Sequence, residues 1–455
     1  MAVASPARAG STPAIPRDAL LLGASIFLFI AATNILTPLI PQVRDDFGVS
    51  ITTAGLIVGS YGLARLAVDL PAGWLSSTIG HRRLAIFAIV LLIVSSFVGY
   101  WSPTAGVLIV ARVGSGIAVG ILATVILSAL AATASTANRG KVMSLFHVAN
   151  NTGIAVYPLI GGLVGLAFTW RATFLVTAAL AVVASAILLP LLPRIDFGRA
   201  GATKGGADES RVLHGRQRKV AFAATNFGVV ANMIHRHGVR NTILPLYAAT
   251  SLGLGGLSIA SAIALMSVTG LLVATPGGML GDRIGRRRVI TAGLAAVAVG
   301  DLAFILTDDL ATFLLVSALI GFGDFFTSSQ TALLSEIVPA RERTKALSTY
   351  RFSADLGALI GPILLALIMD LTEARNAVLV AVSVLLVASL CAWFGVPASV
   401  ESPPDGGAAD AVPADPALAS ALASGDAAPT TTSAAPAAHP PSAPAHRSAQ
   451  EGTHR

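Results

Sequence analysis

The sequence predicts an all-α integral membrane protein, with twelve transmembrane helices in two pseudo-symmetric bundles of six. Three observations lead to this fold class. Hydrophobic residues make up 54% of the 455 residues, and the mean hydropathy is +0.77. Charged residues make up only 12%, against roughly 25% in an ordinary soluble domain, so lipid must cover much of the apolar surface. The second half of the chain also repeats features of the first half.

The apolar runs mark where the helices are expected. A run of about 20 apolar residues is long enough to cross the ~30 Å hydrocarbon core of a bilayer. Because no cleavage-site pattern follows the first run and further runs do, we expect it to be a retained helix rather than a signal peptide. The expected helices span residues 18–42, 52–76, 83–101, 104–129, 142–167, 172–193, 220–247, 256–281, 289–307, 310–335, 345–370 and 376–396.

The connections between these helices predict their orientation. Lysine and arginine concentrate in the connections that follow helices 2, 4, 8 and 10, whereas the alternate connections are acidic or nearly neutral. Basic loops remain on the cytoplasmic side of a membrane. We therefore expect a multi-pass protein of the plasma (inner) membrane with both termini in the cytoplasm. The net charge of +7 then reflects topology and does not imply a nucleic-acid partner.

Composition divides the chain into five regions. Residues 1–17 are expected to be a disordered cytoplasmic N-terminus, and residues 18–193 the first six-helix bundle. Residues 194–219 are polar, glycine-rich and basic, which predicts a flexible cytoplasmic linker. Residues 220–396 form the second bundle. Residues 397–455 are rich in Ala, Pro, Ser and Thr and should be a disordered cytoplasmic tail, because they can bury too little apolar surface to fold.

An internal repeat relates the two predicted bundles. Residues 139–144 match residues 343–348, an offset of 204 (343 minus 139). The same offset takes Pro158 to Pro362. Two parallel six-helix halves joined by a long cytoplasmic linker are typical of one large class of secondary transporters.

The most informative motif is a glycine-rich basic turn that occurs in both halves, at residues 71–83 and 276–288. Glycines let helices approach closely, and Asp and Arg side chains can bridge helix ends. We expect Asp282 to pair with Arg283 and Arg287 as a cytoplasmic latch; the alternative is that the arginines only set topology. The predicted cytoplasmic gate comprises Gly73, Gly80, Arg82, Arg83, Gly278, Asp282, Arg283, Gly285 and Arg287.

These turns resemble the signature between helices 2 and 3 of the major facilitator superfamily, and the resemblance covers residues 18–396. Residues 112–116 resemble the family's Arg-x-x-x-Gly motif in helix 4. Residues 153–162 resemble the antiporter signature of drug exporters, with Tyr157 in place of a glycine, and residues 38–41 resemble their Pro-x-x-Pro. The resemblance implies the major facilitator fold, most like the twelve-helix drug:proton antiporter (multidrug exporter) group.

Polar residues inside the predicted helices indicate a substrate cavity. Asn232, Arg236 and Arg240 recur every four residues, so they share one helix face that lipid cannot cover. The resemblance implies that helices 1, 4, 7 and 10 line a central cavity. The alternative is a set of internal ion pairs, such as Asp324 with Arg236 or Arg112, that only hold the halves together. The expected cavity residues are Asn34, Arg112, Asn232, His235, Arg236, His237, Arg240 and Asp324.

Three residues are candidates for proton coupling. Asp324 is the first choice, because it lies on a predicted cavity helix near mid-membrane. His235 can titrate near neutral pH, and Asp69 lies in helix 2. It stays open whether Asp324 changes charge or remains ionised beside an arginine. Asp301 in helix 9 has no evident partner in the sequence.

Other pairs and glycines suggest how the helices contact one another. Arg65 and Asp69, and likewise Arg351 and Asp355, lie four residues apart and are expected to pair along their helices. Glycines and prolines in helices 5 and 11 should loosen or kink these helices as a hinge, or else serve as static packing positions. The expected hinge residues are Gly153, Pro158, Gly161, Gly357, Gly361 and Pro362.

The sequence contains no pattern typical of an enzyme. It has no phosphate-binding loop, no Cys and His cluster with metal-ligand spacing, and a single cysteine, Cys391. We therefore expect no enzyme activity, no metal and no cofactor other than a proton gradient. The predicted function is export of small organic molecules, neutral or anionic in charge, by proton antiport, in a monomer. The alternatives are a proton-coupled symporter that imports an organic anion, and a non-transporting receptor or sensor on the same fold.

Overall fold

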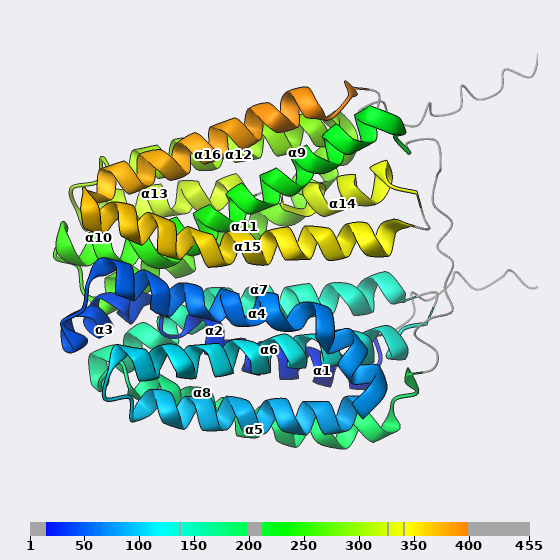
Figure 1. Ribbon diagram of the computed structural model, residues 1–455, viewed down its shortest axis with the longest axis horizontal. Helices are drawn as coiled ribbons and strands as arrows, with labels where there is room; N and C mark the ends of the chain where they lie inside the picture. Colours follow the sequence, from blue (N-terminus) through cyan, green and yellow to red (C-terminus); the bar gives the residue numbers. More distant parts are fainter. Residues whose placement is uncertain (1–14, 136–137, 198–211, 325–326, 340–341, 399–455) are drawn as a thin grey trace, which may run out of the picture. The chain divides into compact units, whose positions relative to one another are not determined.

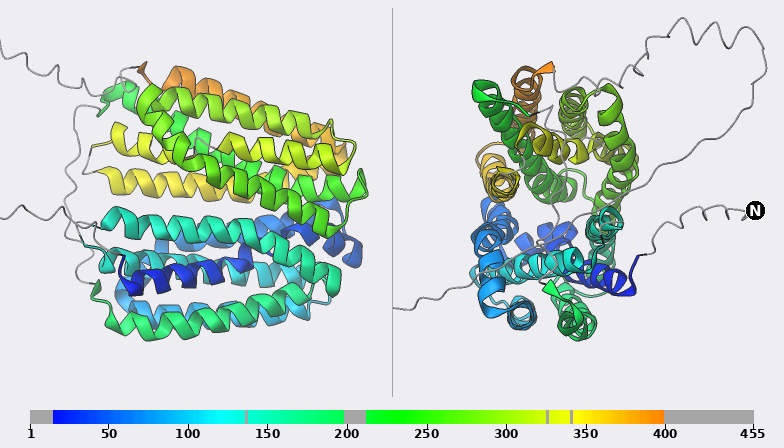
Figure 2. Two further views of the ribbon diagram at one scale, coloured as in Figure 1. Left: turned by 180° about the vertical axis from the view of Figure 1, so that it is seen from behind. Right: turned by 90° about the vertical axis from the view of Figure 1, so that its right-hand side faces the viewer.

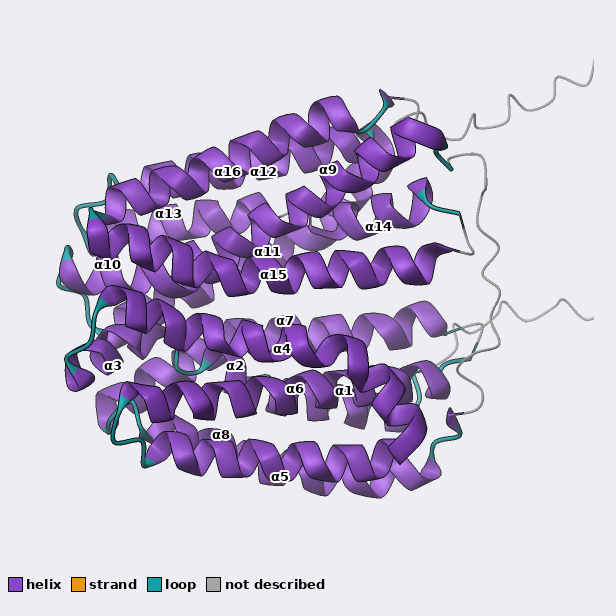
Figure 3. Ribbon diagram, viewed as in Figure 1, coloured by secondary structure: helices purple, strands orange, loops and turns teal. Residues whose placement is uncertain are grey.

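The computed structural model describes residues 15–135, 138–197, 212–324, 327–339 and 342–398. The predicted tail, most of the predicted N-terminus and much of the predicted linker lie outside these residues. Within the described ranges all regular secondary structure is helical (Figure 3). The first half contains α1 (Arg17–Phe29), α2 (Ala31–Asn34), η1 (Thr37–Leu39), α3 (Ile40–Phe47), α4 (Ile51–Ile79), α5 (His81–Tyr100), α6 (Ala105–Thr133), α7 (Arg139–Ala167), α8 (Ala172–Leu191) and η2 (Leu192–Arg194) (Figure 1). The second half contains α9 (Gly215–Met233), η5 (Ile234–Ile243), α10 (Leu244–Thr250), α11 (Gly256–Ile284), α12 (Arg286–Phe304), α13 (Leu310–Gly323), α14 (Thr327–Ile337), α15 (Arg343–Leu371) and α16 (Ala374–Gly395).

Helices occupy all of the ranges predicted from the sequence, and in the described part of the chain eight are long and apolar enough to cross a membrane. The other predicted spans are shorter, interrupted or more polar, so the count of twelve stays a prediction. Large apolar side chains face outward from the bundle: Leu306, Phe168 and Phe394 are 75%, 74% and 80% exposed. Such a surface is stable only against lipid.

Helix lengths and ends confirm the internal repeat. Helices α4 and α11 each contain 29 residues, and so do α7 and α15. Helix α4 stops at Gly80 and α11 stops at Gly285, with backbone φ angles of 90° and 98°. These positive φ values favour glycine, because a Cβ would clash with the backbone there. The glycines of the two basic turns therefore end equivalent helices.

Two of the predicted helices are interrupted rather than continuous. The first, predicted over 18–42, passes through the short 3-10 turn Thr37–Leu39, where Pro38 lacks the N–H that an α-helix needs. The seventh, predicted over 220–247, changes at Ile234–Ile243 into a π-helix. The tenth, predicted over 310–335, is described as α13 up to Gly323 and as α14 from Thr327, and residues 325 and 326 lie outside the described residues. Interruptions of this kind free backbone groups and redirect side chains, and they frequently mark functional sites.

The two halves contact each other closely along α4 and α15, which run side by side in Figures 1 and 2. A Cβ on Gly62 would lie only 3.1 Å from the backbone carbon of Ala358, and one on Gly55 would overlap the carbonyl oxygen of Pro362. Beyond these glycines, the hydroxyl of Thr52 donates to a carboxylate oxygen of Asp370 at 2.7 Å. These contacts join the ends of α4 and α15 that lie away from the basic turns.

A second contact between the halves joins α7 and α11. A Cβ on Gly162 would lie 2.7 Å from the Cβ of Ala260 and 3.2 Å from the carbonyl oxygen of Gly256. Gly162 lies near the end of α7, and Gly256 begins α11, so this contact is also at the end away from the basic turns. Close backbone approach through small residues is the usual way that helices associate in a membrane.

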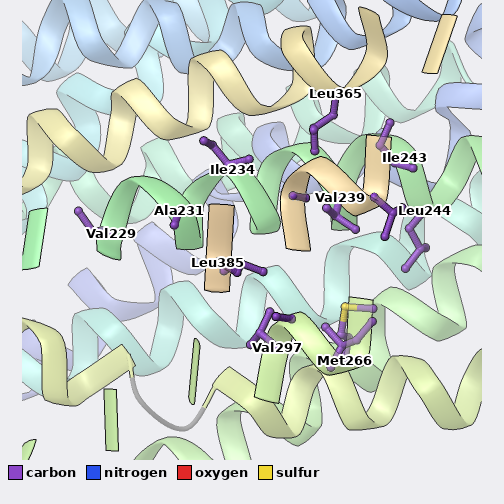
Figure 4. Close-up of a cluster of buried hydrophobic side chains, with 14 of the residues drawn as sticks. Val229, Ala231, Ile234, Val239, Ile243, Leu244, Met266, Val297, Leu365 and Leu385 are labelled. Carbon is purple, nitrogen blue, oxygen red and sulfur yellow. The ribbon is translucent and has the colours of Figure 1, made fainter. Parts of the chain in front are cut away.

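The hydrophobic interior consists of two clusters of buried side chains. One belongs mainly to the first half, and the other mainly to the second half. The second cluster surrounds the π-helix η5, with Leu365 from α15, Leu385 from α16, Val297 from α12 and Met266 from α11 (Figure 4). The polar residues of η5 are thus held in an apolar, well-packed environment.

Candidate functional site

Two adjoining cavities lie between the halves, with volumes of about 220 and 350 Å³. His147 of α7 lines both of them. The first cavity is lined by His147, Asn151, Ile154, Arg236, Arg240, Ser267, Gly270, Leu271, Ala274 and Asp324. The second is lined by Arg65, Gly120, Ala123, Thr124, Leu127, Ser128, Phe146, His147, Arg351, Ala354 and Asp355. Together they approach the size of a site for a small organic molecule.

Asp324 and two arginines dominate the first cavity. The guanidinium of Arg236 donates to Asp324 at 3.0 Å, and Nη1 of Arg240 lies 3.9 Å from the same oxygen. Arg240 also donates to the hydroxyl of Ser267 on α11. The Asp324 and Arg240 side chains are almost completely buried, whereas that of Arg236 is 26% exposed. Arg236 therefore offers the accessible charge, and Arg240 is held behind it.

The second cavity carries an ion pair that crosses between the halves. Nε of Arg65 on α4 lies 4.0 Å from a carboxylate oxygen of Asp355 on α15. The sequence predicted pairs within each helix, Arg65 with Asp69 and Arg351 with Asp355. The Arg65–Asp355 pair was not predicted, and it forms because α4 and α15 pack face to face. The Arg65–Asp69 pair stays a prediction. The side chain of Asp69 lies outside the described residues.

His235 lies behind the cavity, not on its lining as predicted. Its Nδ1 is 2.8 Å from a carboxylate oxygen of Asp301 on α12, and the two side chains are 1% and 0% exposed. Asp301 had no evident partner in the sequence. Neighbouring residues of a helix point in different directions, so His235 of η5 reaches Asp301 of α12 while Arg236 faces the cavity.

Four other predicted cavity residues have different positions. Arg112 is buried, donates to the carbonyl oxygen of Ala32 at 2.8 Å and does not line either cavity. Asn34 and Asn232 are buried and are also absent from both linings, while His237 lies close enough to Arg236 and Arg112 to interact with them electrostatically. Arg112 thus ties α6 to α2 within the first half, and its role in substrate binding stays a prediction.

The cytoplasmic latch is built differently from the prediction. Asp282 near the end of α11 pairs with Arg286 at the start of α12 at 2.8 Å, across the turn at Gly285, and not with Arg283 or Arg287. Nε of Arg286 then donates to Glu336 of α14 at 2.8 Å. The sequence analysis did not identify Glu336 as a partner of this turn.

The remaining gate residues fall into three groups. Arg287 donates to the carbonyl oxygen of Val396 at 3.1 Å, and its guanidinium lies 4.3 Å from the Trp393 ring. Arg82, Arg83 and Arg283 are exposed beside the two helix ends, as topology-setting residues would be. Gly80 and Gly285 end their helices, and Gly278 lies within α11. The surroundings of Gly73 lie outside the described residues.

The predicted hinge residues occupy tightly packed positions in continuous helices. Helices α7 and α15 run uninterrupted past Pro158 and Pro362. The glycines of this predicted hinge face backbone or side chains of neighbouring helices at short range: a Cβ on Gly361 would lie 2.8 Å from Cα of Ile234, and one on Gly357 would lie 2.8 Å from Cβ of Met233. Gly153 and Gly161 similarly face Ile30 and Ile35 of the first predicted helix. Their role as a hinge stays a prediction.

The sequence analysis did not identify two polar residues of the first cavity, His147 and Ser267, because neither stands out from its neighbours in the sequence. His147 lies near the basic start of α7, where a further polar residue does not stand out. Its spacing of four residues from Asn151 could have revealed a polar face. Ser267 of α11 is a lone hydroxyl in an apolar helix, which more often bonds its own helix, as it also does here with Ile263.

Comparisons with known proteins place this architecture in a family. The family model described as Major Facilitator Superfamily matches twice, over residues 22–237 and 227–437. The chain belongs to the Major Facilitator Superfamily. The double match agrees with the repeat of α4 and α7 in α11 and α15.

Relatives and solved structures support the same assignment. An uncharacterized MFS-type transporter of Methanocaldococcus jannaschii is 23% identical over 372 residues, which cover 80% of this chain and 94% of that protein. A bacterial homologue of the human lysosomal transporter Spinster has the same fold, with a TM-score of 0.68, 13% identity and coverage of 85% and 98%. A human organic anion transporter matches with a TM-score of 0.60, 14% identity and coverage of 83% and 100%. The protein is therefore a multi-pass membrane transporter of this superfamily.

Proposed function

We propose that this protein is a proton-driven secondary transporter of small organic anions that works by alternating access. The observation that carries the proposal is the charge of the two cavities. Four arginines line them, Arg65, Arg236, Arg240 and Arg351, against two carboxylates, Asp324 and Asp355, which leaves a formal charge of +2. A positive site in a low-dielectric interior attracts anions and repels cations.

The arrangement of the halves supports alternating access. The close contacts through Gly55, Gly62 and Gly162 seal the end away from the basic turns. The larger cavity instead involves Arg65, Ser128 and other residues of α4, α6, α7 and α15. If the basic turns are cytoplasmic, as proposed, the structure represents an inward-facing state, with the inner membrane as its location and both termini in the cytoplasm. Rocking of one half against the other would open the opposite end.

Two coupling modes are compatible with this design. Uptake by symport is favoured by the positive cavity, since an anion and a proton compensate each other's charge. Export by proton antiport is supported by the resemblance of residues 153–162 to the antiporter signature of drug exporters. In either mode we propose that a monomer works with the proton gradient as its only energy source, without a bound cofactor.

Flux in proteoliposomes tests the proposal. Purified protein is reconstituted, and saturable movement of a panel of radiolabelled carboxylates, sulfonates, neutral sugars and quaternary amines is measured with and without an imposed pH gradient. We expect saturable flux of anions that depends on the gradient and no flux of permanent cations. Preference for permanent cations would refute the anion proposal, and the absence of any saturable flux would favour a receptor or sensor on the same fold.

A further inference from the structure

A buried histidine–carboxylate pair lies one residue away from the proposed substrate site. Nδ1 of His235 and a carboxylate oxygen of Asp301 are 2.8 Å apart, and water reaches neither side chain from the surface. Such a pair is a weak source of stability, because the cost of removing charge from water offsets the attraction between the partners. Its presence in a membrane helix therefore requires another explanation.

We propose that His235 and Asp301 together form the proton-binding site of this transporter. The inference rests on the proposed function and identifies its coupling site. In the protonated state both ring nitrogens of His235 carry a proton, and Nδ1–H donates to the ionised Asp301. Release of the Nε2 proton leaves a neutral imidazole whose Nδ1–H still donates to the carboxylate. Asp324, the first choice from the sequence, is less suited to this role, because Arg236 at 3.0 Å and Arg240 at 3.9 Å both stabilise its ionised form.

The pair is electrostatically connected to the cavity. His235 precedes Arg236 in η5, and both His235 and Asp301 interact with Asp324 at the end of α13. Arg236 and Arg240 of η5 surround Asp324 on its other side. The neighbouring helices α16 and α11 pack against η5 with apolar side chains such as Leu385 and Met266 (Figure 4). A change in the charge of the pair therefore acts on the cavity mainly through Asp324 and the two arginines beside it, Arg236 and Arg240.

Charge counting indicates how the proton couples to substrate. Arg236 and Arg240 contribute +2, and Asp324 and Asp301 contribute −2, so the cluster is neutral when His235 is neutral. A proton on the pair raises the charge to +1, and an anion on the accessible Arg236 returns it to zero. Since net charge inside a membrane is costly, proton and anion are expected to bind together.

Unsatisfied polar atoms beside the pair indicate how a proton reaches it. The second carboxylate oxygen of Asp301 and both side-chain polar atoms of Asn232 are buried and have no hydrogen-bond partner among the described residues. Asn232 lies on α9 just before His235. Buried polar groups of this kind are normally satisfied by water, and hydrogen-bonded water can pass protons between them.

The decisive experiment measures protonation directly and needs no substrate. The full-length protein is labelled with ¹⁵N-histidine in lipid nanodiscs, and the imidazole signals are followed by NMR from acid to alkaline pH. The His235 signal is assigned by its loss in His235→Gln. We expect His235 to change protonation state or tautomer with pH, and Asp301→Asn to shift or remove that transition. Asp308→Asn, which alters an exposed carboxylate after the same helix, is the matched control and should leave it unchanged.

If the NMR signals show that His235 keeps the same tautomer and the same number of protons from acid to alkaline pH, the proposal is overturned. The pair with Asp301 would then have a structural role only. If Asp301→Asn does not fold, the wild-type titration still decides the question, supplemented by infrared detection of a pH-dependent carboxyl band that His235→Gln removes. The transport proposal is tested separately. Titration without any flux would reject the transport proposal alone, whereas pH-driven flux without His235 titration would reject only this proton site.

Discussion

Replacing Gly55 with alanine should shift the protein away from the inward-facing state. The added methyl group would overlap the carbonyl oxygen of Pro362 and the methyl of Ala366. Neither atom belongs to a flexible side chain, so α15 has to move away from α4 for the variant to close this end. Overpacking of this kind costs roughly 1–3 kcal/mol. Because about 1.4 kcal/mol changes an equilibrium tenfold, the ratio of inward- to outward-facing molecules should fall about fivefold to somewhat over a hundredfold.

Accessibility of an engineered cysteine measures this shift. Cys391 is replaced by serine, and Ser128 in the larger cavity is replaced by cysteine. A membrane-impermeant maleimide is then applied to inside-out vesicles, which expose the proposed cytoplasmic side. In this background Gly55→Ala should slow labelling, by about threefold if the two states begin equally populated and the ratio falls fivefold.

A second glycine at the same end of the molecule provides the control. A Cβ on Gly255, before α11, would meet no atom within 4 Å, so Gly255→Ala should leave the labelling rate unchanged. Equal labelling rates in Gly55→Ala and the parent would refute the reasoning, because they would show that close contact between α4 and α15 does not determine access to the cavity.

Three further predictions concern the gate, the substrate site and coupling. Glu336→Gln should slow initial transport rates in proteoliposomes more than Asp282→Asn does. The Asp282 side chain is 63% exposed and that of Glu336 only 20%, and exposed ion pairs contribute only about 0–1 kcal/mol. Equal effects of the two substitutions would contradict this. Arg236→Ala should weaken affinity for an anionic substrate about ten- to a hundredfold, the value of a charge-assisted hydrogen bond, and unchanged calorimetric affinity would remove Arg236 from the site. Asp324→Asn should lose both uphill transport and substrate exchange, because it leaves Arg236 without its partner; a variant that still exchanges substrate but cannot concentrate it would make Asp324 the proton carrier.

Much of the fold follows from physical rules that act over short stretches of sequence. Apolar runs located the helices, because a membrane requires about 20 apolar residues per crossing. The glycines at Gly80 and Gly285 marked helix ends, because a positive φ angle favours glycine. The offset between residues 139–144 and 343–348 revealed the repeat that the structure confirms.

The side-chain partners were less predictable, because they depend on contacts between distant segments. A spacing of four assumes α-helical geometry, so it could not foresee the π-helix or the contact of His235 with Asp301. The Arg65–Asp355 pair depends on how α4 packs against α15, which local sequence does not encode. Glu336 was missed because its partner Arg286 lies 50 residues away in the sequence, on another helix.

The central claim is that a positive cavity carries organic anions with energy from protons, and flux under an imposed pH gradient tests it most directly. Proteoliposomes with an alkaline interior are diluted into acidic buffer that contains radiolabelled small carboxylates, with a protonophore and Arg236→Ala as controls. The account predicts that at least one carboxylate accumulates inside above its external concentration, under this gradient for symport or under the reversed gradient for antiport, and that both controls abolish this accumulation. Accumulation that survives the protonophore, or saturable flux confined to permanent cations, would contradict the account.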